Sequence, residues 1–327
     1  MIPLPRSARF VCLLSLVLMP TCVLGQSSSK RAFLDAKEAG PDFAIQGEYV
    51  GTIGVKAKVG AQVIALGGGR FDAVIYTEGL PGAGWDGKSK VRLHGDTSDN
   101  AAHLKGKNIE GTIKDGVFSG TAEDGVKFEL KKVERTSPTL GAPPPPGAIV
   151  LFDGKNTNAW QVGKLEEGGL LGVPAITRQP FEDVLLHLEF RTPFMPRSRG
   201  QGRGNSGVYL ADQYEVQVLD SFGLEGLDNE CGGIYKAARP LVNMCFPPLA
   251  WQTYDIEFRA ARFAPDEKTK KQNAVIGVRH NGVPIQYNLE LKGPTPGGHR
   301  ADDHTGPIFL QDHGNPVRFR NIWVLPR

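Results

Sequence analysis

The hydrophobic and polar positions of this chain alternate with a period of two over many short segments, and no long amphipathic helix is evident. Because successive side chains of a β-strand point to opposite faces of a sheet, this alternation predicts strands. In the first half, Gly, Asp and Asn separate the runs, and Asp-Gly pairs mark hairpin turns. We therefore expect a small antiparallel barrel or sandwich over residues 41–135. Its predicted strands are 47–53, 62–65, 71–76, 90–93, 109–113, 117–122 and 126–130.

No motif of this first half predicts a ligand site. The glycines at 67–69 are followed by neither a Gly-Lys-Ser/Thr motif nor a convincing helix, so we expect a flexible turn and not a phosphate-binding loop. His94 and His103 lack partners at metal-binding spacing and are expected on the surface. The aromatic residues are numerous enough for a core but form no evident sugar-binding platform; they are Phe43, Tyr49, Phe71, Tyr76, Trp85, Phe118 and Phe128.

A proline-rich segment separates this region from the rest of the chain. Residues 136–147 contain four consecutive prolines together with small residues. This composition is typical of an extended, semi-rigid spacer. Proline runs also bind the aromatic grooves of partner proteins, which an exported chain gives little reason to expect. We predict a linker over 136–147 and a second domain over 148–327.

The second domain shows the same alternation. His187 lies in one of its predicted strands, where it is expected to face a groove or solvent and not to act as a catalyst. Residues 193–204 are irregular and basic, which indicates either a solvated loop or a mobile rim over a binding site. A favoured Asn-Gly hairpin turn lies at 281–282. The predicted strands are 148–152, 181–190, 250–259, 273–279, 283–287 and 317–325.

Polar side chains concentrate on one predicted strand pair, 206–210 and 214–219, which a turn at 211–213 joins. Along the second strand, apolar residues alternate with Glu215 and Gln217, so that one face is apolar and the other carries a carboxylate and a carboxamide. Such a polar face is either an ordinary solvated surface or a concave binding surface.

The beginning of the chain has the features of an export signal. Residues 1–25 combine a basic start, containing Arg6 and Arg9, with an apolar stretch and small residues before the expected cleavage point. Cys22 stands in a poor lipobox. Without the two arginines the formal charge of +3 falls by two, which leaves no electrostatic basis for binding nucleic acid. We expect a periplasmic or extracellular protein with no transmembrane segment in its mature chain.

Two further cysteines, Cys231 and Cys245, lie in the second domain. In an exported protein, an isolated pair at this separation most simply forms a disulfide, which would contribute about 3 kcal/mol by closing a loop of about 15 residues. A metal site is the weaker interpretation, since no His or additional Cys nearby completes it.

Several motifs of the second half resemble one known family. LFDGKNTNAW at 151–160, GNSGVYL at 204–210, YEVQVLDS at 214–221 and GPIFLQDHGNPVRFRNIWV at 306–324 are similar to the 3-keto-disaccharide hydrolase domain, formerly a domain of unknown function. The resemblance spans about 148–327. Members have a concanavalin-like or laminarinase-like jelly roll, in which two antiparallel sheets pack face to face and the concave sheet binds sugar. It implies an all-β chain, with a jelly-roll β-sandwich following the small antiparallel β domain.

The resemblance also implies hydrolysis of glycosides whose sugar was first oxidised at C3. A C3 ketone acidifies the C2 proton and places the C1 aglycone β to the resulting enolate, so elimination followed by hydration cleaves the bond. The enzyme then needs a base near C2 and a group that stabilises the enolate oxygen. An ordinary glycosidase instead needs two carboxyls about 5 to 10 Å apart. The implied partners are a 3-keto sugar and an upstream sugar 3-dehydrogenase.

Strand parity and the family's motifs point to particular residues. Glu215 is the candidate base and His313 the candidate acid. No cofactor is evident, although a divalent ion held by His313 with Glu215 or Asp220 would suit an enolate. Arg320, beside Asn321, is either a sugar contact or a structural residue. The expected substrate-binding residues are Gln217, Asp220, Tyr235, Lys236, Gln311 and Arg320.

Two other functions fit the same residues. The concave face of a jelly roll can bind carbohydrate without catalysis, which would make the chain a carbohydrate-binding module. An extracytoplasmic scaffold or interaction protein is the other alternative. Turnover of a 3-keto-glycoside separates the enzyme from both.

Overall fold

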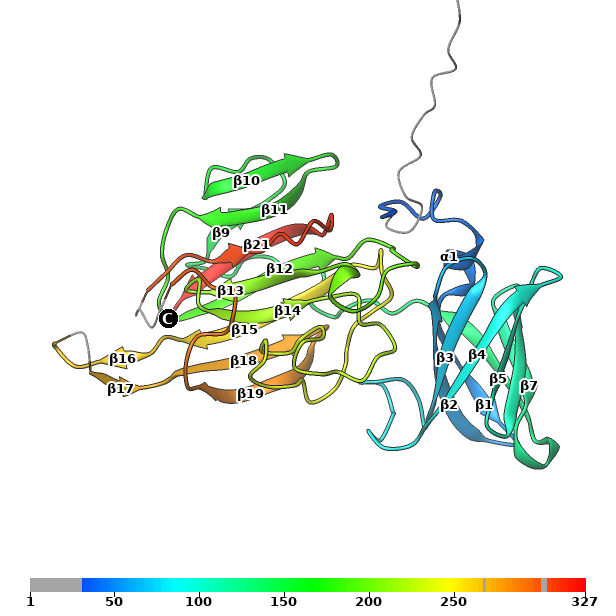
Figure 1. Ribbon diagram of the computed structural model, residues 1–327. Coiled ribbons are helices and arrows are strands. Elements are labelled where there is room, and N and C mark those ends of the chain that lie inside the picture. The colour runs from blue at the N-terminus through cyan, green and yellow to red at the C-terminus, as the bar shows by residue number, and fades with distance from the viewer. Residues whose placement is uncertain (1–30, 267–268, 301–304) are drawn as a thin grey trace, which may run out of the picture.

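A computed structural model describes residues 31–266, 269–300 and 305–327 of the chain. It contains two β units, a closed barrel and a curled sheet that folds into a sandwich (Figure 1). The predicted all-β class, with a jelly-roll-like sandwich after a small antiparallel domain, is confirmed. The predicted export signal, residues 1–25, lies outside the described residues.

The barrel is an antiparallel meander in which the first and last strands pair with each other. Its interior is filled by apolar side chains such as Tyr49, Phe71 and Phe118. Helix α1 (Pro41–Ile45) precedes the first strand, and no helix of the described residues has the length and apolarity needed to cross a membrane. The strands are β1 (Gly47–Ile53), β2 (Ala57–Ala65), β3 (Arg70–Thr77), β4 (Lys90–Ser98), β5 (Ala101–Gly106), β6 (Ile109–Lys114), β7 (Val117–Thr121) and β8 (Lys127–Val133).

The sandwich is built from one sheet in the order β14-β13-β20-β11-β21-β12-β15-β18-β19, with β10 beside β11 and β9 beside β21. The contact between β11 and β21 is short, and the sheet curls there into two layers. The strands are β9 (Ile149–Phe152), β10 (Trp160–Glu166), β11 (Leu170–Thr177), β12 (Val184–Arg191), β13 (Ser206–Leu210), β14 (Tyr214–Val218), β15 (Gln252–Arg259), β18 (Ala274–His280), β19 (Val283–Leu291), β20 (Phe309–Leu310) and β21 (Arg318–Pro326). A separate ribbon joins β16 (Arg262–Phe263) to β17 (Lys270–Gln272).

The core of the sandwich lies between the β13–β14 layer and the β12–β15 layer. Val216 and Val218 of β14 belong to the same buried cluster as Leu188 of β12 and Ile256 of β15. The Tyr254 hydroxyl crosses the interface and donates a hydrogen bond to the carbonyl oxygen of Gln217, at 2.7 Å. Because alternate side chains point away from this core, each layer also has an outward face, and both outward faces carry buried polar groups.

The proline-rich linker lies against the outward face of the β12–β15 layer. Ser137 Oγ is 2.6 Å from Thr253 Oγ1, and the Gly141 amide donates to the Glu189 carboxylate at 2.6 Å. The carbonyl oxygen of Ala142 accepts from Trp323 Nε1 at 3.1 Å. The segment expected to act as a spacer is therefore held along its length by side chains of the sandwich.

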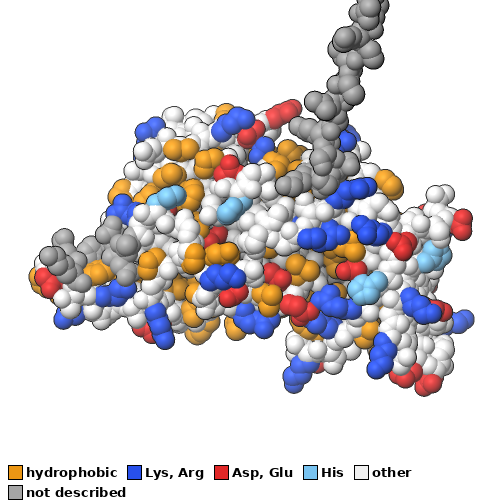
Figure 2. Space-filling view, viewed as in Figure 1, with side chains coloured by type: hydrophobic (Ala, Val, Ile, Leu, Met, Phe, Trp, Pro, Cys, Tyr) orange, Lys and Arg blue, Asp and Glu red, His pale blue; other side chains and the backbone are white. Residues whose placement is uncertain are grey.

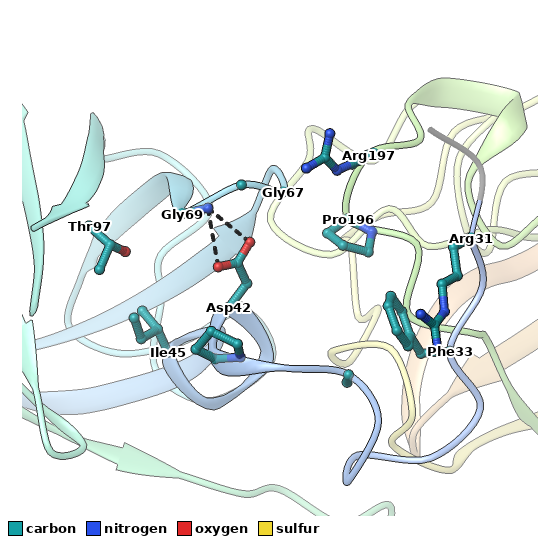
Figure 3. Close-up of a pocket in the computed structure, with 12 residues that line it drawn as sticks. Arg31, Phe33, Asp42, Ile45, Gly67, Gly69, Thr97, Pro196 and Arg197 are labelled. Carbon is teal, nitrogen blue, oxygen red and sulfur yellow. Dashed lines mark hydrogen bonds between the residues drawn. The ribbon is translucent and has the colours of Figure 1, made fainter. Parts of the chain in front are cut away.

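The loop at 193–204 contacts the barrel (Figure 3). Arg199 and Arg203 donate to the carbonyl oxygens of Leu66 and Ala65, at 3.0 and 3.1 Å. The glycines at 67–69 form the expected turn with positive φ angles of 82°, 70° and 74°. The loop predicted as either solvated or a rim over a site thus helps to attach the sandwich to the barrel.

The apolar clusters of the two units interpenetrate. Ile64, Val74 and Tyr76 of the barrel belong to the core cluster of the sandwich. In the opposite direction, Phe194 of the sandwich belongs to the core cluster of the barrel, and its ring centroid lies 5.2 Å from that of Phe43. Burial of apolar surface therefore joins the two units directly.

Candidate functional site

The polar strand pair forms an antiparallel hairpin whose register gathers the candidate residues. Ala211 and Asp212 both have φ of 55° in the tight turn between β13 and β14. This turn sets Tyr209 opposite Glu215 and Gly207 opposite Gln217. Glu215 and Gln217 consequently share the outward face, as their parity predicted.

Glu215 is held by two neutral side chains. The Tyr209 hydroxyl donates to Glu215 Oε2 at 2.7 Å. With the Gln217 amide turned so that Nε2 faces its acceptors, this amide donates to Glu215 Oε1 at 2.8 Å. Gly207 provides the space, because a Cβ atom at that position would lie 2.2 Å from Glu215 Oε1. Both carboxylate oxygens therefore have a donor, and neither donor carries a charge.

The environment of Glu215 favours its protonated form. Burial raises the pKa of Glu215 from 4.5 to about 7, against the hydrogen bond from Tyr209, which lowers it. In the described part of the chain, no ion pair reaches this carboxylate. Burial and the adjacent carboxylate also raise the pKa of Tyr209, so its hydroxyl stays protonated and remains a donor. A carboxyl poised near neutral pH is suited to exchanging protons with a substrate.

Gln311 extends this group from the neighbouring strand. Its Nε2 donates to the Tyr209 hydroxyl at 3.2 Å, and its backbone amide donates to the carbonyl oxygen of Gly207 at 2.9 Å. Among the residues that the structure describes, Gln311 Oε1 is buried without a hydrogen-bond partner. A buried acceptor of this kind is available to a ligand hydroxyl. The prediction that Gln311 joins the Glu215 group agrees with this geometry.

A segment at 295–299 covers one side of the group. Thr295 Oγ1 accepts from the Glu215 amide at 2.9 Å, and the Pro296 carbonyl oxygen lies 3.0 Å from the Tyr209 hydroxyl. His299 packs its ring 5.0 Å from that of Phe309 and hydrogen-bonds Asp212 at 3.0 Å. The sequence interpretation missed this segment, which carries no periodic pattern of its own.

Tyr235 lies at the opposite edge of the group. An isolated antiparallel bridge pairs Ile234 with Val216, and the Tyr235 amide donates to the Glu215 carbonyl oxygen at 3.2 Å. In this register Tyr235 shares the outward face with Glu215. Lys236 is exposed, with Nζ 5.7 Å from the Tyr235 ring centroid. Both residues therefore border the group, in the place that closure over a sugar requires.

Three of the predicted residues lie elsewhere. Asp220 is buried in an ion pair with Arg203, whose Nε is 2.7 Å from Asp220 Oδ2. His313 is exposed in the loop after β20, and no side-chain contact joins it to Glu215 in the described residues. Arg320 lies on the outward face of the other layer, where its Nε donates to Glu189 at 2.6 Å. The structure thus unites Glu215, Gln217, Gln311 and Tyr235 but not these three.

The predicted disulfide between Cys231 and Cys245 is absent from the structure, which records both as free, buried thiols. Each sulfur has a hydrogen-bonding neighbour instead. Cys231 Sγ is 3.2 Å from the Tyr254 hydroxyl, and Cys245 Sγ is 3.4 Å from the Leu219 carbonyl oxygen. The pair packs beneath β14 within the sandwich core.

The possible metal ligands do not gather. Glu215 binds neutral donors, Asp220 binds Arg203, and His313 is exposed. Within 31–266, 269–300 and 305–327, no group of three or more His, Cys, Asp or Glu side chains is arranged to hold a metal ion. These residues therefore do not fit the divalent site that the sequence left open.

A second buried polar group lies under the linker. His187 Nδ1 is 2.6 Å from Asp255 Oδ1, and Glu189 accepts from Arg320 and from Asn321. Burial lowers the pKa of His187, but its hydrogen bonds to Asp255 and Glu189 outweigh this effect and raise it. Burial would raise the pKa of Glu189, yet hydrogen bonds from its neighbours lower it to about 2. His187 is thus buried in an ionic network instead of facing a groove or solvent.

The charges on the visible surface are mixed, with acidic, basic and apolar side chains interspersed over both units (Figure 2). Residues 147–325 match the sequence profile of a family described as the 3-keto-alpha-glucoside-1,2-lyase-like domain. No curated protein matches the chain.

Two solved structures from Parabacteroides distasonis ATCC 8503 are similar to the second half. One, described as a "putative glycosyl hydrolase", is 35% identical with a TM-score of 0.51 and covers 56% of this chain and 85% of that chain. Another with the same description is 17% identical with a TM-score of 0.41 and covers 55% and 94%. The family match and the first of these structures support activity on glycosides.

Proposed function

The chain belongs to the 3-keto-alpha-glucoside-1,2-lyase-like family, and from this premise we propose that it cleaves glycosides whose sugar carries a ketone at C3, with Glu215 as the base. The ketone makes the C2 proton acidic and turns the C1 oxygen into a leaving group. The protein then needs one poised base and donors for the developing negative charge.

The observation that carries this proposal is the environment of Glu215. Its carboxylate is buried, its pKa is raised to about 7, and its contacts are the Tyr209 hydroxyl and the Gln217 amide. A base whose pKa lies near the working pH is present in its ionised form and still binds a proton strongly. No permanent positive charge among its described contacts weakens that basicity.

The reaction needs no net proton from solvent in its first half. Glu215 takes the proton from C2, and the electron pair of that C–H bond forms an enolate with the C3 carbonyl. Collapse of the enolate breaks the bond between C1 and the aglycone oxygen, which recovers the proton that Glu215 holds. Addition of water to the resulting double bond then gives the free 3-keto sugar.

The neighbouring side chains have separate parts in this scheme. Gln311 Oε1, the buried acceptor without a described partner, receives a sugar hydroxyl. The Tyr209 hydroxyl, which stays protonated, holds Glu215 in place, and Tyr235 forms an aromatic wall beside it. The Glu215 contacts described above include no second carboxyl, in contrast to the paired carboxyls of an ordinary glycosidase.

Turnover of matched substrates tests the proposal. Purified protein is expected to release p-nitrophenol from p-nitrophenyl 3-keto-glucoside and not from the unoxidised glucoside. Glu215→Gln should reduce that release by about 10² to 10⁴-fold while leaving substrate binding intact. Glu257→Gln, which changes an exposed glutamate of β15, is the matched control and should keep wild-type turnover.

Unchanged turnover in the Glu215 variant would remove this residue from the mechanism. Saturable sugar binding without turnover of either substrate by the wild type would instead favour a carbohydrate-binding module. We further propose that the protein acts outside the cytoplasm, where residues 1–25 would direct it, and that a sugar 3-dehydrogenase supplies the ketone.

A further inference from the structure

A second candidate site lies between the barrel and the sandwich. A cavity of about 720 Å³ is enclosed by the barrel loop around 81–90 and the sandwich loop around 224–243. This volume is in the range of small-molecule sites. We propose that the cavity binds a pyranose ring of a neutral oligosaccharide, with Trp85 as its platform. The choice of a sugar rests on the proposed activity, whereas the site itself is separate from Glu215.

Trp85 is held in a fixed orientation. Its ring packs edge-on against Tyr76, with centroids 4.9 Å apart, and its indole Nε1 donates to the Ser89 carbonyl oxygen at 3.0 Å. The side chain is nevertheless only partly buried and lines the cavity. An aromatic ring of this kind offers an apolar face against which the C–H face of a pyranose can pack. Its orientation is set before any ligand binds.

A buried chain of hydrogen bonds supports the platform from below. The Tyr76 hydroxyl donates to Gln62 Oε1 at 2.8 Å, and Gln62 Nε2 donates to Glu48 Oε1 at 2.9 Å. Arg135 then grips Glu48 through Nε and Nη2, both at 2.6 Å. The same guanidinium donates to the carbonyl oxygen of Pro81 at the start of the cavity loop, at 2.8 Å. Such support is typical of positions where a binding side chain must not move.

The rim supplies polar groups of both signs. Glu225 of the sandwich binds Lys90 and Arg92 of the barrel, so these charges close the cavity between the two units. Asp86 accepts from the amide of Lys88 at 2.8 Å through Oδ1 alone. Hydroxyl groups of a sugar can bond to such carboxylates and ammonium groups. Because Lys90 is already paired with Glu225, the cavity does not specify a strongly anionic ligand.

The cavity and the Glu215 group share one loop. Residues 222–243 place Tyr235 beside Glu215, and the same loop lines the cavity with Arg239 and Leu241. Arg239 is fixed by donating to the carbonyl oxygens of Gly226 and Glu225, both at 3.1 Å. A sugar held on Trp85 would therefore be held next to the loop that borders the reaction site.

Binding of unoxidised disaccharides tests the proposal independently of turnover. Titration calorimetry with sophorose, laminaribiose, cellobiose and maltose should show saturable binding of at least one of them to the full chain. Trp85→Ala should weaken that binding at least tenfold, whereas Glu215→Gln should leave it unchanged. Tyr287→Ala is the matched control, since Tyr287 is an exposed aromatic residue, 78% accessible, that does not line the cavity.

A measurement on the wild type guards against misfolding of the variant. Oxidation of Trp85 by N-bromosuccinimide, followed by peptide mass spectrometry, should slow several-fold when the binding disaccharide is saturating. Equal oxidation with and without sugar, wild-type affinity in a folded Trp85 variant, or no binding by any of the four disaccharides would each overturn the site. Loss of 3-keto-glycoside turnover in Glu215→Gln with Trp85 binding intact would leave both proposals standing.

Discussion

Two buried glutamates occupy equivalent places in this molecule and differ in almost every chemical respect. Glu215 and Glu189 each lie on the outward face of a sandwich layer, and each is covered by a segment without regular structure. Glu189 is bound by the Arg320 guanidinium, the Asn321 amide and the Gly141 amide, and its pKa falls to about 2. Glu215 has a phenol and a carboxamide, and its pKa rises to about 7.

The difference shows that burial alone does not decide what a carboxylate does. Desolvation penalises the charged form at both positions, but the donors around Glu189 repay this cost and those around Glu215 do not. A fully compensated carboxylate fastens the structure, in this case by holding the linker. A carboxylate left partly uncompensated remains able to bind a proton, which is the property that a base requires.

The largest effect on stability is expected at Glu189. Glu189→Ala removes a buried partner of Arg320 and leaves the amides of Asn321 and Gly141 without their acceptor. Breaking a buried ion pair costs about 3 to 5 kcal/mol, and the low end applies because the Arg320 side chain is 37% exposed and can rehydrate. Urea unfolding at pH 7 measures this loss. Glu257→Ala should change the unfolding free energy by less than about 0.5 kcal/mol, and a similar small value for Glu189→Ala would contradict the comparison.

The next largest effect is expected at Glu215, with the opposite sign. A carboxyl whose folded pKa is raised from 4.5 to about 7 contributes stability below pH 4.5 and loses it as the pH rises through 7. Glu215→Gln removes this loss, so the variant should be more stable than wild type at pH 8 by on the order of 2 to 3 kcal/mol. The advantage should vanish at pH 4. Thermal or urea unfolding at the two pH values measures it, and an equal difference at both would rule out titration of Glu215 as the cause.

The smallest effect concerns the hydrogen bond from Tyr209. Its hydroxyl favours the ionised form of Glu215, so Tyr209→Phe should raise the pKa of this carboxyl further. In the pH dependence of kcat/KM for a 3-keto-glucoside, the acidic limb should move to higher pH by up to about one unit. Tyr287→Phe, at an exposed tyrosine, provides the matched control. A limb that stays in place would show that another group sets it.

Local patterns predicted much of the fold because each depends on neighbouring residues only. Alternation placed Glu215 and Gln217 on one face, and the Asn-Gly pair gave the turn between β18 and β19, where φ is 50° at Asn281 and 78° at Gly282. Strand β5 was missed because its Ala101, Ala102 and Lys105 are poor strand formers. Strands β10 and β11 were missed as well.

The misplaced site residues depend on tertiary structure. Parity linked His313 to Gln311, but β20 ends at Leu310, and alternation has no meaning in the loop beyond it. Arg320 alternates as predicted within β21, yet nothing in that strand reveals which layer it joins. Asp220 follows β14 as expected, but Arg203, 17 residues earlier, captures its carboxylate. The contacts from Thr295 and Pro296 likewise depend on the path of a loop distant in sequence.

The interpenetrating apolar clusters have a consequence for how this protein can be divided. Ile64, Val74 and Tyr76 complete the sandwich, and Phe194 completes the barrel, so each half lacks part of its own interior. A gene cut at the proline-rich segment would encode two polypeptides that each expose apolar surface and lack a partner to cover it. Residue 147, where the family match begins, marks a limit of shared ancestry and not an independent unit of folding.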